Sequence, residues 1–418
     1  MPGGFGPRLL LILPTTTYRA EAFVEAALRL EADLTVASEH DSAFSQSQPG
    51  RFLTLDFQDP NRAAQQVVAY AREYPLAAVF GVDDVTAVLA AHASRALNLA
   101  HNPVEAVEAA GDKYRQRSVL RAAGIPVPNF ELYDAGMDVH SISRQLRYPC
   151  VIKPVALSAS RGVMRANDPQ EFTQAFARLR AILQRPDVSV GGGAAASVLV
   201  EDYVPGVEFA LEGLLENGRL HVLALFDKPD PPEGPFFEET IYVTPSRFPS
   251  EVQAALVSCA EDAARALGLE RGPVHVELRY NDRGPWLIEL AARPIGGKCG
   301  QVLRFGLEAS VSLEQVLLGR ALGGYRDLPP RDERAVAVMM IPVPKAGVLQ
   351  EVRGVEDALG VPLVTDVIIT VHRGQALVPL PEESRYPGFI FARGDTPEAV
   401  ELAVRDAHAR LELRIREV

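Results

Sequence analysis

Two glutamates on a predicted β-hairpin are the residues that most directly suggest chemistry. The segment Val274–Arg293 consists of two alternating runs joined by Asp282-Arg283-Gly284, a pattern typical of a hairpin with a three-residue loop. In that register Glu277 faces Glu289. Two facing carboxylates repel each other unless a cation lies between them, and magnesium is commonly held by one or two carboxylates together with substrate phosphates. We therefore expect Glu277 and Glu289 to bind magnesium or manganese.

The same register divides the hairpin into two faces. The apolar face is expected to contain Val276, Leu278, Tyr280, Trp286, Ile288 and Leu290. The polar face is expected to contain His275, Glu277, Arg279, Glu289 and Arg293. A surface ladder of salt bridges through the two arginines is the alternative explanation of this polar face.

A second group of residues suits a phosphate. Lys153 lies in an apolar strand, PCVIKP, where its charge is costly unless an anion meets it. The small-residue loop that follows would let backbone N–H groups approach phosphate oxygens, and lysines supply point charges to such oxygens. The predicted phosphate-binding residues are Lys113, Lys153, Ser158, Ser160, Arg161 and Gly162.

The elements that position these residues follow from apolar periodicity. Residues 8–110 alternate between short apolar runs and amphipathic stretches, which predicts βαβ units and a parallel sheet, without a G-x-G-x-x-G fingerprint. Helices are expected over 169–184, 250–268 and 311–322, and residues 189–197 read as a flexible connector. The fold class is therefore α/β and α+β, with several domains.

Two acidic pairs remain open at this stage. Asp83 and Asp84 begin a helix at the carboxyl end of a strand, where helix capping is favoured over ligand binding. Glu238 and Glu239 either face a substrate pocket or lie exposed at a strand end.

Composition limits the classes of partner. The net charge of −12 and the pI of about 5.3 disfavour nucleic acid. No apolar run approaches the ~18 residues of a membrane span, and the N-terminus reads as a strand rather than a signal peptide, so we expect a cytoplasmic protein. The three cysteines are too far apart in sequence to suggest a zinc site, and we expect them to be reduced and packed.

Taken in order, these motifs resemble the ATP-grasp superfamily of carboxylate–amine ligases over about residues 1 to 325. The matching motifs are Asp112-Lys113, Gly124-Ile125-Pro126-Val127-Pro128, Lys153, Ser158 to Gly162, Glu201-Asp202-Tyr203-Val204, Gly206 with Glu208, Glu277 with Glu289, and Arg293 with Gly296-Gly297. The resemblance implies a Rossmann-like N-terminal domain (1–110), a small nucleotide-binding lobe (111–196), a large lobe with the metal-binding hairpin (197–325) and a C-terminal α+β segment (326–418).

The resemblance also implies roles for single residues. Lys113 and Lys153 would bind ATP phosphates, the segment from Glu201 through Tyr203 to Val204 would line the adenine slot, and Glu208 would hold the ribose. The residues implied at the substrate site are Arg293, His275, Gly296 and Gly297. Arg293 would stabilise an oxyanion or hold a substrate carboxylate, whereas a structural role is the alternative for His275.

Within the superfamily the chain is most similar to L-amino acid ligases, the dipeptide synthetases, with carnosine-type synthetases close behind. Such a ligase joins a small-molecule carboxylate to an amine through an acyl phosphate, and a homodimer is possible. One departure is Ala291, which stands where many members have a metal-binding asparagine. The alternatives are a biotin-carboxylase-like or purine-pathway enzyme, and a non-catalytic ATP-binding protein.

Overall fold

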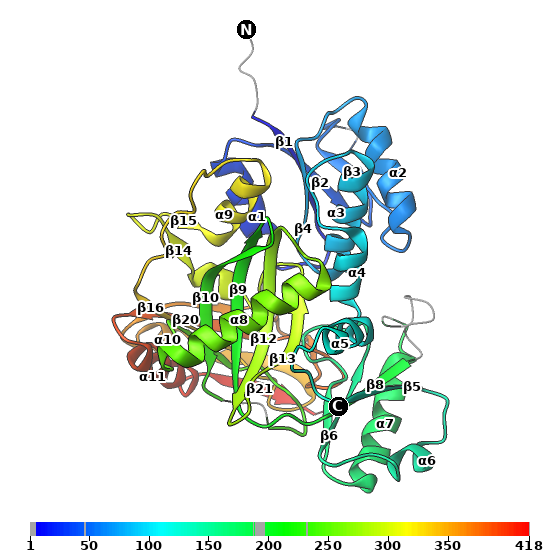
Figure 1. The fold of residues 1–418 in the computed structure, drawn as a ribbon. Helices are drawn as coiled ribbons and strands as arrows, with labels where there is room; N and C mark the ends of the chain where they lie inside the picture. The colour runs from blue at the N-terminus through cyan, green and yellow to red at the C-terminus, as the bar shows by residue number, and fades with distance from the viewer. Residues whose placement is uncertain (1–5, 46, 187, 189–196, 231–232, 418) are drawn as a thin grey trace.

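A parallel sheet forms the N-terminal part of the chain, as predicted. The computed structural model describes residues 6–45, 47–186, 188, 197–230 and 233–417. The first sheet has the order β3-β2-β1-β4 with parallel pairing throughout, and α1, α2 and α3 cover its two faces (Figure 1). The bounds are β1 Arg8–Ile12, α1 Ala20–Arg29, β2 Asp33–Ser38, β3 Phe52–Thr54, α2 Pro60–Ala71, β4 Ala78–Gly81 and α3 Asp84–Ala96.

A four-stranded antiparallel sheet with one long helix follows, and we call this unit the small lobe. Helices α4 (Val104–Gly111) and α5 (Lys113–Ala122) connect it to the first sheet. Its strand order is β5-β8-β6-β7. The bounds are β5 Phe130–Asp134, α6 Val139–Ser143, β6 Cys150–Pro154, β7 Met164–Ala166, α7 Pro169–Leu183 and β8 Ser197–Asp202. Of the expected connector over 189–197, residues 189–196 lie outside the described part of the chain.

An eight-stranded sheet, which we call the large sheet, forms the centre of the molecule. Its order is β13-β12-β9-β10-β11-β16-β20-β18. The strands are β9 Val207–Glu216, β10 Arg219–Lys228, β11 Ile241–Thr244, β12 Gly272–Asn281, β13 Gly284–Ala291, β16 Ala335–Met340, β18 Val364–Ile369 and β20 Gly388–Gly394. Because β11 pairs with β16, the large sheet contains strands from both sides of the predicted domain boundary at 325/326. The domain boundary itself stays a prediction.

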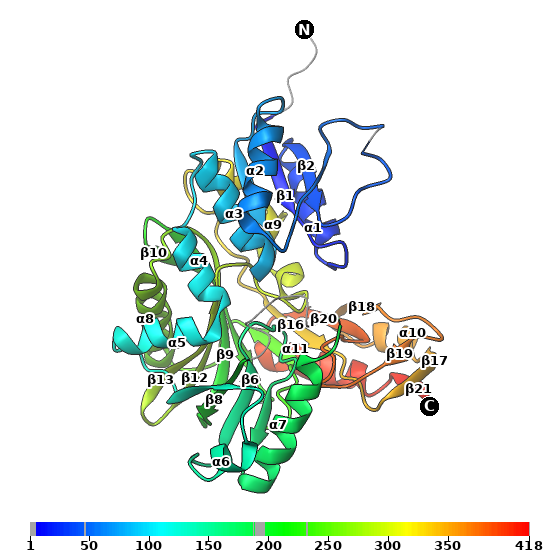
Figure 2. The same cartoon turned by 90° about the vertical axis from the view of Figure 1, so that its right-hand side faces the viewer.

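Helices and short strands complete this part of the chain. Helix α8 buries Leu256, Cys259, Ala260, Ala263 and Leu267 on one face, at the spacing of an amphipathic helix. The helices are α8 Ser250–Leu267, α9 Leu313–Ala321, α10 Val355–Leu359, α11 Pro397–His408 and the 3₁₀ helix Cys299–Val302. The remaining strands are β14 Arg304–Phe305, β15 Val311–Ser312, β17 Gly347–Arg353, β19 Ala376–Leu377 and β21 Glu412–Arg416. In Figure 2 the N-terminal sheet, the small lobe and the C-terminal strands surround the large sheet from three sides.

The hairpin of β12 and β13 corrects one detail of the predicted register. Asn281 pairs with Gly284, so the loop has two residues rather than three. A bulge between Glu277 and Leu278 then restores the predicted pairing of Glu277 with Glu289. As a result Leu287 is fully buried and Trp286 pairs with Arg279, so the predicted apolar face was wrong for Trp286 and Ile288.

Two further expectations can be compared with the structure. All three cysteines are free and buried, as predicted. Among the described residues, no helix has the length and apolar character needed to cross a membrane.

Candidate functional site

Most of the predicted site residues line one cavity of about 490 Å³ between the N-terminal sheet, the small lobe and the large sheet. We call it the central cavity. The predicted residues in its wall are Lys113, Lys153, Ser158, Ser160, Glu201, Tyr203, Val204, Glu208, His275, Glu277, Glu289, Arg293, Gly296 and Gly297. These residues are dispersed along the chain, and the fold brings them together.

Lys153 and Glu201 form a buried ion pair on the small lobe. Antiparallel pairing of β6 with β8 places them diagonally across the ladder, with Lys153 Nζ 2.5 Å from Glu201 Oε2. Arg117 of α5 donates from Nε to Glu201 Oε1 at 2.7 Å, and from a terminal nitrogen to the carbonyl of Ile288. Burial lowers the pKa of Lys153 to about 8 although Glu201 opposes the shift. Glu201 is therefore occupied by two cations, a role that the sequence did not suggest.

Lys113 connects the small-residue loop to the metal-binding hairpin. It is the first residue of α5, which Asp112 caps by accepting from the backbone N–H of Arg115. Its Nζ donates to the carbonyl of Leu157 at 2.7 Å and to Glu289 Oε1 at 3.1 Å. Lys113 thus joins the two predicted groups of residues.

A row of alternating charges crosses the large sheet. Strand register sets Lys228 of β10 and Arg279 of β12 on either side of Glu208 of β9. Both cations are hydrogen-bonded to Glu208, with Arg279 Nε 2.8 Å from Oε2. Because these contacts outweigh the cost of burial, the pKa of Glu208 is lowered. The carboxylate predicted to hold ribose is thus already paired in this structure.

The next row holds the predicted metal ligands. Glu277 and Glu289 pair across β12 and β13, and Glu239 is hydrogen-bonded to Glu277. Burial, with Glu208 and Glu289 nearby, raises the pKa of Glu277, whereas Lys113 and Lys153 hold the pKa of Glu289 at about 2 against the effect of burial. Two facing carboxylates supply oxygen ligands suited to a hard divalent cation, which binds them in their deprotonated form. The residues present therefore fit magnesium.

The metal would need further ligands from outside the protein. In the part of the chain that the structure describes, no cluster of three or more His, Cys, Asp or Glu side chains is arranged to hold a metal ion. Ala291, which lies beside this row, contributes no oxygen. Phosphate oxygens and water are the ligands that magnesium commonly adds to one or two carboxylates.

A third row places His275 next to Glu212. The two residues pair across β12 and β9, with Nδ1 3.9 Å from Oε2, and Ala291 is the partner of His275 on β13. Burial, reinforced by the positive charge of Arg293, lowers the pKa of His275 to about 3, so the imidazole is neutral. Burial also raises the pKa of Glu212 well above its ordinary value. Neutral His275 therefore faces a carboxyl group whose ionisation is disfavoured by burial.

Arg293 and Asp84 form an ion pair in the wall of the central cavity. Arg293 Nε lies 3.0 Å from Asp84 Oδ2, and Arg293 also donates to the carbonyl of Pro294. Asp83 is the N-cap of α3 in a capping box with Thr86, as the preferred interpretation predicted, whereas Asp84 contacts the site. The hydroxyl of Tyr18 accepts a hydrogen bond from the backbone N–H of Gly297 at 2.9 Å.

Arg161 and Gly162 are the predicted site residues that do not line the central cavity. Arg161 Nε donates to the carbonyl of Glu382 at 2.8 Å, and the backbone N–H of Gly162 donates to that of Pro381 at 2.9 Å. These contacts direct the end of the small-residue loop toward the C-terminal segment. Their predicted role at the phosphate stays a prediction.

Three family models match successive parts of the chain. An ATP-grasp N-terminal domain matches residues 24–101, an ATP-grasp domain matches 146–302, and an L-amino acid ligase C-terminal domain 2 matches 339–416. The chain is an ATP-grasp protein. The C-terminal match lies in a segment where the sequence motifs gave no assignment.

Relatives of this ATP-grasp protein agree with that assignment. The crystal structure of an L-amino acid ligase from Bacillus licheniformis is 28% identical, with a TM-score of 0.84, and covers 99% of this chain and 100% of that one. The alanine–anticapsin ligase of Bacillus subtilis (strain 168) is 26% identical over 359 residues, which is 78% of this chain and 74% of the relative. Carnosine synthase 1 of Gallus gallus is 37% identical over 153 residues, which is 37% of this chain and 16% of the relative.

These findings make the ATP-grasp protein an ATP-dependent ligase that joins a carboxylate to an amine. Sequence reasoning missed several residues in or beside its site, namely Lys228, Tyr242, Arg117 and Glu212. Glu239, from the acidic pair whose position was left open, lines the central cavity. The signal available for Lys228 was a lysine that ends an otherwise apolar strand, which is the same signal that identified Lys153.

Proposed function

We propose that this ligase activates the carboxylate of an amino acid and joins it to the amine of a second amino acid, giving a dipeptide, ADP and phosphate. The observation that carries this proposal is the pairing of Arg293 with Asp84 at one end of the central cavity. A cation and an anion 3.0 Å apart match the carboxylate and the ammonium group of an amino acid. The likeness to L-amino acid ligases over the whole chain supports it.

The phosphates of ATP would lie at Lys113 and Lys153, which supply positive charge to the central cavity. Ser158 and Ser160 line the same cavity. Tyr203 and Val204 would contact the adenine, since they lie in the segment that follows β8. Glu277 and Glu289 would hold the magnesium or manganese ion, which would neutralise charge on the phosphates. Charge stabilisation and positioning are the main tasks in phosphoryl transfer.

Amide formation needs groups that stabilise an oxyanion while water is kept away. The substrate carboxylate would attack the γ-phosphate of ATP, giving an acyl phosphate and ADP, and the amine would then attack the acyl carbon and release phosphate. Arg293 offers a fork of N–H donors to the oxyanion of that second step. His275 is neutral, so it would position substrate by hydrogen bonding together with the backbone of Gly296 and Gly297.

The proposed activity is tested by supplying ATP, magnesium and the standard amino acids singly and in pairs. We expect phosphate release that requires a particular pair, together with a dipeptide detected by mass spectrometry. Glu289→Gln removes one proposed metal ligand and should lower the rate at least about 100-fold. Glu308→Gln is the matched control, because Glu308 is exposed on a loop away from the central cavity.

Two outcomes would contradict the proposal. Turnover that persists in Glu289→Gln would place the metal elsewhere. Phosphate release that depends on bicarbonate or on a nucleotide, and on no amino acid pair, would favour the carboxylase-like or purine-pathway alternative.

A further inference from the structure

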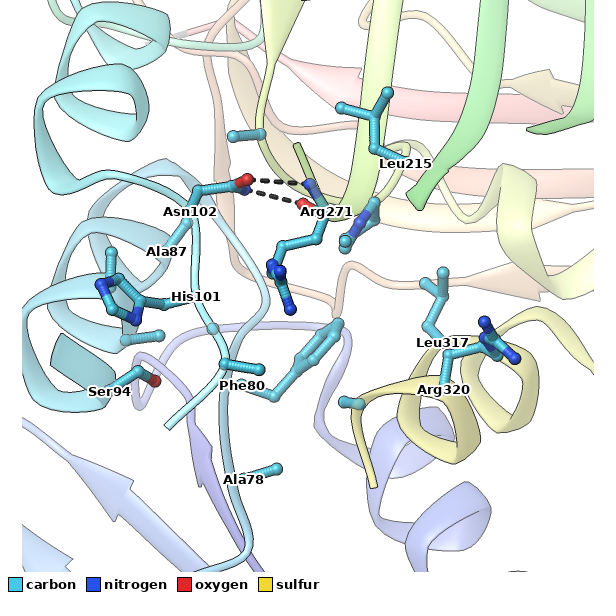
Figure 3. A pocket seen from close by; sticks show the side chains of 18 of the residues that line it. Ala78, Phe80, Ala87, Ser94, His101, Asn102, Leu215, Arg271, Leu317 and Arg320 are labelled. Carbon is cyan, nitrogen blue, oxygen red and sulfur yellow. Dashed lines mark hydrogen bonds between the residues drawn. The ribbon is translucent and has the colours of Figure 1, made fainter. Parts of the chain in front are cut away.

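A second cavity has a volume of about 260 Å³ (Figure 3). Its wall is formed by β4 and α3 of the N-terminal sheet, by residues 100–102, by α9, by the end of β9 and by the start of β12. None of its lining residues is shared with the central cavity. We call it the interdomain cavity.

Arg271 gives this cavity an unsatisfied cationic group. Its Nε is buried and has no hydrogen-bond partner, and Figure 3 shows the guanidinium extending toward the ring of Phe80. The main chain at Arg271 is fixed, because the side-chain amide of Asn102 accepts from its N–H at 2.9 Å and donates to its carbonyl at 2.7 Å. A buried N–H group without a hydrogen-bond acceptor costs free energy. A ligand that brings an acceptor to Arg271 Nε would remove that cost.

The rest of the wall is mainly apolar. Phe80, Ala87, Ala91 and Leu317 contribute side chains without hydrogen-bonding groups. Two other charged side chains line the wall, Arg320 and Glu216, and they are paired with each other. A single unsatisfied cation beside apolar side chains matches a monoanion with an apolar body better than a phosphate dianion. The volume is below the ~300–1,000 Å³ of most ligand pockets, so the occupant is small.

We propose that the interdomain cavity is a second ligand site, which binds a small carboxylate with an apolar body at Arg271. Nothing in the proposed ligation reaction uses this cavity. Its position between the N-terminal sheet and the large sheet means that a ligand there would contact both units at once.

The same two chain segments line both cavities, so a ligand in the interdomain cavity can affect the central cavity. Gly81 and Ala292 line the interdomain cavity, while Asp84 and Arg293, a few residues further along the same segments, line the central cavity. The ion pair between Asp84 and Arg293 ties these segments together. A ligand that moved β4 relative to residue 292 would therefore alter the proposed amino acid site. This coupling rests on the proposed function, whereas ligand binding itself does not.

Binding is tested with isovalerate as the probe, using titration calorimetry on the full chain without substrates. The neutral isostere isovaleramide is the ligand control. We expect isovalerate to bind and isovaleramide to bind at least about tenfold more weakly, since it lacks the charge. Arg271→Gln should weaken isovalerate at least about tenfold, whereas Arg293→Gln, in the central cavity, should change its affinity less than about twofold.

A second variant protects the test against loss of folding. Ala87→Leu, on a half-buried position of α3, should fill the cavity and also abolish isovalerate binding. Melting temperatures check that both variants fold, which we expect because the side chain of Arg271 carries no hydrogen bond that the structure describes. Absence of binding to the wild type, or binding that Arg293→Gln removes and Arg271→Gln does not, would overturn the proposal.

The coupling is tested separately by the KM for the amino acid substrates. Saturating isovalerate should change this KM in the wild type and leave it unchanged in Arg271→Gln. If binding is found without any change in KM, the coupling is overturned and the site stands. If no ligation is found at all, calorimetry still decides the site, so the two proposals fail independently.

Discussion

Lys153 is a buried cation whose charge depends on its neighbours. It pairs with Glu201, and Arg117 and Lys113 stand close enough to oppose its protonation. The negative charge of Glu201 is shared by two cations, since Arg117 pairs with the same carboxylate. The arrangement leaves net positive charge in the wall of the central cavity, which is what an ATP phosphate requires.

The pKa of Lys153 predicts a pH dependence of ATP binding. Burial lowers this pKa to about 8, so the free ligase has a charged Lys153 below pH 8 and loses that charge as the pH rises through 8. We therefore expect the KM for ATP to be constant below pH 8 and to rise above it. Lys153→Arg keeps its charge and should remove this dependence, at some loss of fit. Identical pH profiles for the two proteins would contradict the prediction.

Ala291 offers a test of the metal site by adding a ligand. Its side chain lines the central cavity next to the row of Glu277 and Glu289. Ala291→Asn supplies an amide oxygen and should lower the magnesium concentration for half-maximal activity about tenfold, which corresponds to about 1.4 kcal/mol. Ala291→Leu has a similar size without an oxygen and should lower activity without lowering that concentration. An equal magnesium concentration for half-maximal activity in Ala291→Asn and in the wild type would contradict this prediction.

Sequence reasoning located single residues where a local pattern carried the signal. Strand alternation suggested that Glu277 and Glu289 share a face, and their pairing was correct because a bulge offset the one-residue error in the loop. Arg117 was missed because its role depends on a contact between α5 and β8, whose residues are 84 positions apart. The contact of Arg161 with Glu382 was missed for a related reason, since the two residues lie 221 positions apart. Such pairings leave no mark in local spacing.

Strand β9 carries two buried glutamates whose pKa values are shifted in opposite directions, which follows from the sheet register. Glu208 lies between Lys228 and Arg279, which hold its pKa down against burial. Glu212, four residues further, pairs with neutral His275 and accepts from the backbone N–H of Ile295, and burial raises its pKa. The same residue type thus has a lowered pKa in one row and a raised pKa in the next.

These environments predict different costs for the same substitution. Glu208→Gln removes a buried anion that contacts both Lys228 and Arg279 and should reduce the free energy of unfolding by about 3–5 kcal/mol. Glu212 accepts a backbone hydrogen bond that a glutamine oxygen can also accept, so Glu212→Gln should cost less than about 1 kcal/mol. Lys228 and Arg279 lower the pKa of Glu208 below the unfolded-state pKa of 4.5. The stabilisation by Glu208 is therefore present above pH 4.5 and is lost as the pH falls through the lowered pKa. Urea unfolding at neutral pH measures both variants, and equal costs would contradict the prediction.

The predicted elements were right in kind where the periodicity was long. The helices expected over 169–184 and 250–268 occur as Pro169–Leu183 and Ser250–Leu267. The loop of the β12–β13 hairpin was wrong by one residue, and the bulge at Glu277 compensated for that error. A bulge depends on how a strand meets its neighbours on both sides, so alternation within one hairpin cannot locate it.

At the scale of the whole molecule, the C-terminal segment is part of the architecture that holds the central cavity. Strands β16, β20 and β18 extend the large sheet, and Ser384, Tyr386 and Phe389 reach the cavity wall. No motif marks this segment in the sequence, because its contribution is a sheet edge and a few side chains. The division of the chain into four domains stays a proposal.

The small lobe is held against the C-terminal segment by exposed ion pairs, and this contact predicts how tightly the site closes. Arg178 of α7 makes a two-pronged contact with Glu382, at 2.5 and 2.8 Å, while Arg161 and Gly162 bind the backbone beside it. Because the pair is partly exposed, Glu382→Gln should shift closure by no more than about 1 kcal/mol, and unproductive ATP hydrolysis should rise up to about fivefold. High salt should have the same effect on the wild type. Glu412→Gln breaks a more exposed pair within one strand and should change nothing; a matching rise there would contradict the role of the contact.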